Sequence, residues 1–327
     1  MKCWGSNRFG QLGDGTFSDS LVAKDVPGLT IGVIDISSGR LHTCAVLGSG
    51  IVKCWGNNNN GEFGDGTKTS KNVPTAVLGL TDAMQVASGG SHTCAVTNSG
   101  AVKCWGNGFW GQLGDGKFDG STTPVDVLGI GGIVVSVSAG GFTNCAVLLS
   151  AETKCWGDFR NGPAHPGDST PKVVLGLTGG VISVSVGTAH LCALLRSGGA
   201  KCWGDNSRGQ LGDGTVFNSD SPVDVFGLTH GVISIEAKYD SACAITTSGA
   251  AKCWGQNSGG NNGFSAGNKP VEPIGLTSSV ATVAVGSVQS CAALDSGIAK
   301  CWGLNSNGEV GDGTRNTTFT PKTVVGF

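Results

Sequence analysis

The sequence predicts an all-β protein, a β-propeller of four-stranded antiparallel blades, and three observations support this fold class. The tripeptide Cys-Trp-Gly occurs seven times in the 327 residues, at intervals of 47 to 51 residues. The chain contains 57 glycines, which weaken helix interiors and suit the turns between short strands. Apolar runs with a period of two residues, typical of strands, recur in these intervals. A repeat of about fifty residues that carries several short strands is typical of a propeller.

The first predicted strand of each repeat, strand A, is an alternating run. In the third full repeat Val135, Val137 and Ala139 alternate with serines, and comparable runs begin at Ile182 and Ile233. Alternation places one set of side chains on each face of the strand. The run is therefore predicted to be a strand.

A β-hairpin is predicted to follow strand A. The runs 42–46 and 51–56 flank the loop Gly48-Ser49-Gly50, and a three-residue hairpin loop favours a glycine in the left-handed conformation at its end. These two runs are strands B and C. The tryptophan of each Cys-Trp-Gly points to the face opposite the cysteine, and we expect it to pack between blades.

The fourth strand, D, is marked by a proline, as in residues 124–129. Proline lacks the amide donor of a central strand, so D is expected at the outer edge. The loop before it ends in Gly-Asp-Gly, a sequence typical of a tight structural turn. Calcium would need more oxygen ligands than each turn offers. The aspartates of these turns are Asp14, Asp65, Asp213 and Asp312.

The predicted strands make six complete blades and half of a seventh. Residues 2–29 supply only strands C and D. We therefore expect a single propeller domain over residues 1–327 and a chain that is a fragment of a longer one, unless a neighbouring segment completes the half blade. The full blades are predicted at residues 31–79, 82–129, 132–176, 180–227, 230–275 and 279–326.

Twelve of the thirteen cysteines fall into pairs separated by ten residues, one on strand B and one on strand C. Folding the hairpin about Ser49 places the partners opposite each other, with Cβ atoms ~4.5 to 5.5 Å apart, close enough for a disulfide. Reduced cysteines acting as small buried apolar residues are the alternative, and Cys3 has no partner. The expected disulfides are Cys44–Cys54, Cys94–Cys104, Cys145–Cys155, Cys192–Cys202, Cys243–Cys253 and Cys291–Cys301.

Charge and composition argue against several classes of partner. The net charge is −2 and no basic run occurs, so a nucleic-acid partner is not expected. No apolar stretch in this segment approaches the ~20 residues of a membrane-spanning helix. No metal or other cofactor is expected either, because each blade offers only two cysteines and zinc needs four ligands.

The histidines indicate no catalytic centre. His42, His92 and His190 occupy equivalent positions in different repeats, so they cannot converge on one site, and structural hydrogen bonding is expected. His165 and His230 lie in loops without a neighbouring pattern of acid or nucleophile. We therefore expect no catalytic residue.

Residues that depart from the repeat consensus are the candidates for binding a partner. Arg40, Phe142, Tyr239 and Asp240 lie in the turns between strands A and B. These turns gather near the axis at one end of a propeller, so the four residues are predicted to face a shared funnel and to contact a protein or a glycan. Tyr239 is the single tyrosine of the chain. Drift in an exposed turn is the alternative.

A second group of candidates lies in the loops between strands C and D. Phe109 and Trp110 are expected on the face opposite the A–B turns. The pairs Arg8-Phe9 and Phe159-Arg160 occupy comparable loops. Exposed aromatic and arginine side chains are typical interface anchors, although a loop aromatic can also fold back onto its own blade.

The repeated phrases resemble a known family. His-Thr-Cys-Ala-Val, Lys-Cys-Trp-Gly and Gly-Gln-Leu-Gly-Asp-Gly-Thr, the last at 10–16 and 209–215, are similar to the repeat signature of the regulator-of-chromosome-condensation family. The resemblance covers essentially the whole chain and implies a seven-bladed propeller. Members of that family include guanine-nucleotide exchange factors, β-lactamase-inhibiting proteins and secreted bacterial proteins, and the chain most resembles the secreted bacterial members.

The expected function is non-catalytic: an extracellular or cell-surface binding and structural module with a protein partner, self-assembly or a glycan ligand. Disulfides favour an oxidising compartment. A protein inhibitor of a secreted enzyme is the first alternative, and an exchange factor for a small GTPase is the second, disfavoured by the lack of a basic tail and of a long insertion. An enzyme is not expected, since a fold alone does not establish chemistry. The sequon at Asn316 would permit glycosylation in a eukaryotic secretory route.

Overall fold

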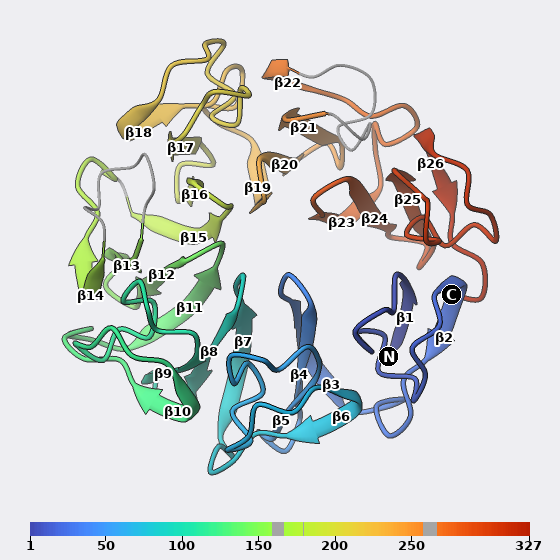
Figure 1. Cartoon of the computed structure of the whole chain (residues 1–327). Helices are drawn as coiled ribbons and strands as arrows, with labels where there is room; N and C mark the ends of the chain where they lie inside the picture. Colours follow the sequence, from blue (N-terminus) through green and yellow to red (C-terminus); the bar gives the residue numbers. More distant parts are fainter. Residues whose placement is uncertain (159–166, 179, 258–266) are drawn as a thin grey trace. The chain divides into compact units, whose positions relative to one another are not determined.

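The computed structural model describes residues 1–158, 167–178, 180–257 and 267–327 (Figure 1). Within these ranges the chain forms twenty-six β-strands and no helix. Accordingly, no described segment is a helix long and apolar enough to cross a membrane. The predicted all-β class is confirmed.

The described strands form six four-stranded antiparallel sheets and one two-stranded sheet. Each four-stranded sheet is one blade, with its strands A, B, C and D side by side in chain order. The half blade consists of β1 (Lys2–Gly5) and β2 (Ser20–Asp25), which take the places of strands C and D. The predicted propeller class, with six complete blades and half of a seventh, is confirmed.

Blades 1 to 3 contain strands β3 to β14, which can be followed from blue to green in Figure 1. Their bounds are β3 (Val33–Ser38), β4 (His42–Leu47), β5 (Val52–Gly56), β6 (Lys71–Ala76), β7 (Ala83–Ser88), β8 (His92–Thr97), β9 (Val102–Gly106), β10 (Ser121–Asp126), β11 (Val134–Ala139), β12 (Thr143–Leu148), β13 (Thr153–Gly157) and β14 (Asp168–Val173).

Blades 4 to 6 contain strands β15 to β26. Their bounds are β15 (Val181–Val186), β16 (His190–Leu195), β17 (Ala200–Gly204), β18 (Ser219–Asp224), β19 (Val232–Lys238), β20 (Ser241–Thr246), β21 (Ala251–Gly255), β22 (Gly267–Val271), β23 (Val280–Val285), β24 (Gln289–Leu294), β25 (Ala299–Gly303) and β26 (Thr318–Thr323).

The described residues divide into two compact units. The first unit comprises residues 1–18, 24–158 and 167–174 and contains blades 1 to 3 together with β1. The second comprises residues 19–23 and the described residues from 175 to 327, with blades 4 to 6.

The apolar core lies between successive blades of a unit. In one cluster Cys94, Cys104 and Val102 of blade 2 pack with Val137 and Trp156 of blade 3. The strand C tryptophan also donates a hydrogen bond from its ring nitrogen to the preceding blade, as from Trp156 Nε1 to the Gln112 carbonyl oxygen at 3.1 Å. The prediction that these tryptophans pack between blades is confirmed.

The proline of strand D lies at the outer edge of each blade. In β10, Pro124 lies where the pairing with β9 changes register, between Ser121 and Val125. A residue that cannot donate to the ladder is tolerated at an edge or a bulge, and here both conditions apply. The prediction of D as the outer strand is confirmed.

Candidate functional site

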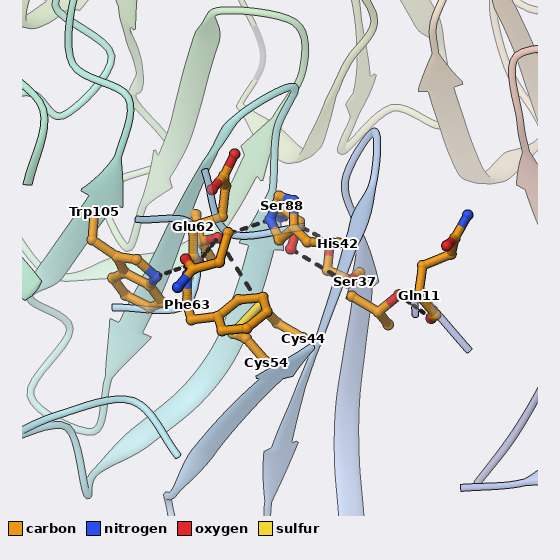
Figure 2. The surroundings of a disulfide bond; sticks show 12 residues. Gln11, Ser37, His42, Cys44, Cys54, Glu62, Phe63, Ser88 and Trp105 are labelled. Atoms are coloured by element: carbon orange, nitrogen blue, oxygen red, sulfur yellow. Dashed lines mark hydrogen bonds between the residues drawn. A yellow bond between two sulfur atoms is a disulfide. The ribbon is translucent and has the colours of Figure 1, made fainter. Parts of the chain in front are cut away.

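The six predicted cysteine pairs are disulfide-bonded. In blade 1, Cys44 and Cys54 are directly opposed on β4 and β5, with Cα atoms 4.1 Å apart. Figure 2 shows this bond beside Phe63, and all three residues belong to the core cluster between blades 1 and 2. Cys3 is a free cysteine on β1. The predicted pairing is confirmed, and each disulfide supports the packing of its blade as well as the hairpin.

The histidines of strand B connect neighbouring blades. His42 Nε2 lies 3.0 Å from Thr93 Oγ1 of blade 2, and His92 Nε2 lies 2.8 Å from Asn144 Oδ1 of blade 3. His190 is fully buried, yet both of its ring nitrogens lack a hydrogen-bond partner within the described part of the chain. The equivalent residue in the following blade is Ala242, which has no polar side chain. Burial lowers the pKa of His190 to about 4, against the opposing charge of Asp205.

The Gly-Asp-Gly turns are held by their own side chains. Asp65 Oδ1 accepts hydrogen bonds from the Thr67 amide at 2.9 Å and the Thr67 hydroxyl at 2.7 Å, and Lys71 Nζ lies 2.9 Å from Asp65 Oδ2. Partial burial alone would raise the pKa of Asp65, but these hydrogen bonds and the lysine charge outweigh it and lower the pKa. The turn carboxylate is thus engaged in local structure, in agreement with the predicted structural role.

An aromatic cluster forms where the C–D loop of blade 2 meets the A–B turn of blade 3. The ring centroids of Phe109 and Trp110 lie 5.0 Å apart in an edge-on arrangement, and Trp110 lies 6.2 Å from Phe142. Phe109 is 66% exposed, whereas Trp110 and Phe142 are half-buried. The assignment of Phe109 and Trp110 to the face opposite Phe142 is therefore wrong. The C–D loop of one blade reaches forward onto the A–B turn of the next, which the order of strands within one repeat does not reveal.

An ion pair occupies the equivalent place between blades 4 and 5. Arg208 Nη1 donates to Asp240 Oδ2 at 3.0 Å. Arg208 corresponds to Trp110 in its loop, and Asp240 corresponds to Phe142, three residues before the strand B cysteine. Burial raises the pKa of Asp240, against the opposing charge of Arg208 and with a contribution from Asp205. The sequence analysis missed Arg208, although its position in the repeat was a usable signal.

Tyr239, next to this ion pair, has a left-handed backbone with a φ of 51°. A bulky residue rarely adopts this conformation, and such strain is common at functional sites. Its carbonyl oxygen accepts a hydrogen bond from the Thr188 amide of blade 4 at 2.7 Å. The strained turn is therefore held in place by the preceding blade.

Two half-buried charges precede Tyr239 on strand β19, on the same face of the strand. Burial raises the pKa of the Glu236 carboxyl, against the effects of Lys238 and of a hydrogen bond from Ser185. Burial also lowers the pKa of Lys238, against the charge of Glu236. Blade 5 thus carries Glu236, Lys238 and Asp240 at or next to its A–B turn, and Arg208 of the blade 4 loop pairs with Asp240.

The predicted binding residues are divided between the two units. Arg40, Phe109, Trp110 and Phe142 belong to the first, and Tyr239 and Asp240 to the second. That Arg40, Phe142, Tyr239 and Asp240 face one shared funnel stays a prediction. Phe159-Arg160 and His165 lie outside the described residues. Within the described ranges, no group of three or more histidine, cysteine or acidic residues is placed to hold a metal ion.

The family profile described as RCC1-like domain matches residues 1–327. Among curated relatives, human E3 ubiquitin-protein ligase HERC2 is 41% identical over 80 residues, which are 24% of this chain and 2% of that protein. The ultraviolet-B receptor UVR8 of Arabidopsis thaliana is 36% identical over 78 residues, 24% of this chain and 18% of the receptor. The matches thus span a small part of these relatives.

The fold is similar to that of several solved structures. Human WBSCR16 matches with a TM-score of 0.88 and 20% identity, covering 99% of this chain and 93% of that one. Yeast Prp20, solved with bound Kap60, matches with a TM-score of 0.86 and 21% identity, covering 99% and 83%. The ectodomain of the Physcomitrella patens receptor kinase CR4 matches with a TM-score of 0.55 and 21% identity, covering 92% and 66%. At these identities the likeness concerns the fold.

Proposed function

Since the chain belongs to the RCC1-like domain family, we propose that it is a non-catalytic binding and structural propeller of the extracellular space or the cell surface, with a protein as its partner. The observation that carries this proposal is the contact between a C–D loop and the A–B turn of the next blade, found between blades 2 and 3 and between blades 4 and 5. The contact is aromatic at Trp110 and Phe142 and ionic at Arg208 and Asp240. Variable residues on a constant frame are how binding scaffolds distinguish their partners.

The residues of this contact favour a protein partner. Phe109 is 66% exposed beside two further aromatic rings, and aromatic and arginine side chains dominate the energetics of protein interfaces. Two solved structures of one protein with this fold, yeast Prp20, are described with protein ligands: one with bound Kap60, the other with its binding to Gsp1p and histones. These ligands are properties of Prp20; they support protein binding as a use of the fold.

The disulfides support the proposed location. Six disulfides in one chain are typical of proteins that mature in an oxidising compartment and are rare in the cytosol. The receptor ectodomain among the similar folds supports the same location. An inhibitor of a secreted enzyme remains an alternative compatible with both observations.

The proposal is tested by screening the purified chain against an array of secreted and cell-surface proteins that includes secreted enzymes, with a glycan array in parallel. We expect protein binding that the double substitution of Phe109 and Trp110 by alanine weakens at least about tenfold, as for interface anchors. The matched control is Leu78→Ala, which removes a side chain that is 59% exposed and outside the aromatic cluster.

Binding that survives both the aromatic substitution and Asp240→Ala would place the interface elsewhere on the chain. Binding to glycans alone would contradict a protein partner. Inhibition of a particular enzyme on the array would select the inhibitor alternative.

A further inference from the structure

The five C–D loops that the structure describes in full each carry one variable residue on the same backbone arrangement. This loop position is the fifth residue after the strand C tryptophan, and its amide donates a hydrogen bond to the side chain of the residue two positions later, the frame residue. The bond joins Phe9 to Gln11, Asn60 to Glu62, Trp110 to Gln112, Arg208 to Gln210 and Asn307 to Glu309, at 2.7 to 2.9 Å. The side chain at the loop position can therefore change without a change in the backbone that carries it.

The frame residue matches the residue that it holds. Glu62 accepts a second hydrogen bond from Asn60, from Nδ2 to Oε1 at 2.8 Å, and the same combination of asparagine and glutamate recurs in blade 6. Where the loop position has no side-chain amide, the frame residue is a glutamine. In blade 2 the glutamine is Gln112, whose Nε2 donates instead to Asn107 Oδ1 at 3.1 Å. The hydrogen bonds of the frame are therefore satisfied with either kind of loop residue.

The frame residue also holds the loop against the next blade. Its backbone carbonyl oxygen accepts a hydrogen bond from the strand C tryptophan of that blade, as from Trp105 Nε1 to Glu62 at 2.7 Å (Figure 2). The loop position is thereby brought to the A–B turn of the next blade. The residue that it contacts there, the turn position, is the third before the strand B cysteine, as Asp240 is for Arg208.

The loop and turn positions match chemically at each of four junctions. The pair is apolar between the half blade and blade 1, polar between blades 1 and 2, aromatic between blades 2 and 3, and ionic between blades 4 and 5. Contacts join the aromatic pair, with ring centroids 6.2 Å apart, and the ionic pair, with a hydrogen bond of 3.0 Å. A mismatched pair would place a polar or charged group against an apolar one, which is unfavourable. The pairs are Phe9 with Leu41, Asn60 with Ser91, Trp110 with Phe142, and Arg208 with Asp240.

We propose that the loop and turn positions determine the specificity of this chain for its partner, and that a pair can be exchanged between junctions as a unit, which changes the partner bound and leaves the fold intact. This inference rests on the proposed function, a protein that binds at these junctions, and adds Phe9, Leu41, Asn60 and Ser91 to the binding residues. All eight side chains are half-buried or exposed, so each can touch a partner as well as its neighbour. Specificity is a difference between affinities, and an aromatic pair exchanged for a charged one leaves an apolar partner surface facing two charges.

The test transplants the ionic pair of blades 4 and 5 to the junction of blades 2 and 3, by Trp110→Arg together with Phe142→Asp. The frame residue is glutamine at both junctions, so it needs no change. We expect the double variant to keep its thermal midpoint within about 2 °C of the unmodified chain, measured by circular dichroism. Phe142→Asp alone should lower the midpoint further, because the half-buried carboxylate would lie against an indole ring without its cation.

Binding is compared on the array of secreted and cell-surface proteins, with the unmodified chain and the double variant as soluble probes. Proteins that bind the unmodified chain should bind the double variant at least about tenfold more weakly. The matched control is Phe118→Lys, which changes an aromatic residue of the same loop that is 50% exposed. Lysine is the residue type of Lys68, its equivalent in blade 1, and this control should change binding less than about threefold.

The results separate the inference from the proposed function. Binding of the same proteins by the double variant with equal affinity would overturn the inference and leave the proposed function standing, and so would an equal loss of binding from Phe118→Lys. A double variant destabilised by as much as the two single variants together would overturn the inference as well, since the pair would not be exchangeable as a unit. Failure of the unmodified chain to bind any protein on the array would contradict the proposed function, and the inference with it.

Discussion

At the scale of single residues, His190 differs from its equivalents because of one side chain in the next blade. His42 and His92 each contact a polar side chain of the next blade, Thr93 or Asn144. At the equivalent position next to His190 the residue is Ala242, which has no polar side chain. A buried polar group without a partner costs about 1 to 3 kcal/mol. The cost is therefore local to this blade junction, and a single substitution can relieve it.

Ala242→Thr is expected to stabilise the chain by about 1 kcal/mol, because its hydroxyl supplies the partner that Thr93 supplies to His42. The measurement is the free energy of unfolding in urea. Ala242→Val is the matched control, since it adds the same volume without the hydroxyl. A threonine variant no more stable than the valine variant would show that the hydrogen bond does not form.

The lowered pKa of His190 makes its contribution to stability depend on pH. With a pKa of about 4 when folded and an ordinary value near 6.5 when unfolded, the unfolded chain binds the extra proton first as the pH falls. Stability is therefore lost between about pH 6.5 and pH 4, by up to about 3 kcal/mol.

His190→Gln, the residue type of Gln289 at the equivalent position in blade 6, removes this titration. The difference in unfolding free energy between the unmodified chain and the variant should fall across that range. A pH-independent difference would contradict the assignment to His190.

At the scale of elements, the B–C hairpin and its disulfide form one unit that is also the centre of the packing between blades. Cys94 and Cys104 are fully buried against blade 3, whereas Cys291 of blade 6 is half-buried. The covalent constraint on the unfolded chain is the same in both hairpins, because each links cysteines ten residues apart. A difference between the two hairpins in the free energy of unfolding lost on removing the disulfide therefore measures packing.

Replacing Cys94 and Cys104 together by alanine should lower the free energy of unfolding by about 2 to 3 kcal/mol through loop entropy, with a further loss from the buried sulfur volume. Replacing Cys291 and Cys301 should cost less, since one of these residues is already half-exposed. Unfolding in denaturant measures both. A larger loss for the blade 6 pair would contradict the packing account.

At the scale of the whole molecule, the thirteen cysteines should give one reactive thiol. Twelve are in disulfides and Cys3 is free. When protein from its native source is denatured without reductant, one of these thirteen cysteines should therefore react with maleimide, and all thirteen after reduction. Mass spectrometry counts both. Several reactive thiols before reduction would point to a reducing compartment and against the proposed location.

The residues predicted most reliably are those whose partners are close in sequence. The opposition of Cys44 and Cys54 follows from a hairpin loop that fixes the register between two adjacent strands. The contact of Trp110 with Phe142 joins side chains from different blades, and hydrophobic periodicity contains no information about it. The same limit explains why Arg208 was missed as the partner of Asp240, although the repeat aligns it with Trp110.

The sequence by itself determined the propeller class, the order of strands within a blade, the six disulfides and the half blade, because each depends on local periodicity, loop length and repetition. Only the tertiary structure decided which side chains meet across blades: the contacts of Trp110 with Phe142 and of Arg208 with Asp240, and the lack of a partner for His190 among the described residues. These depend on which residue of the next blade, about fifty positions away, lies opposite. One substitution there leaves the repeat pattern intact and changes the contact.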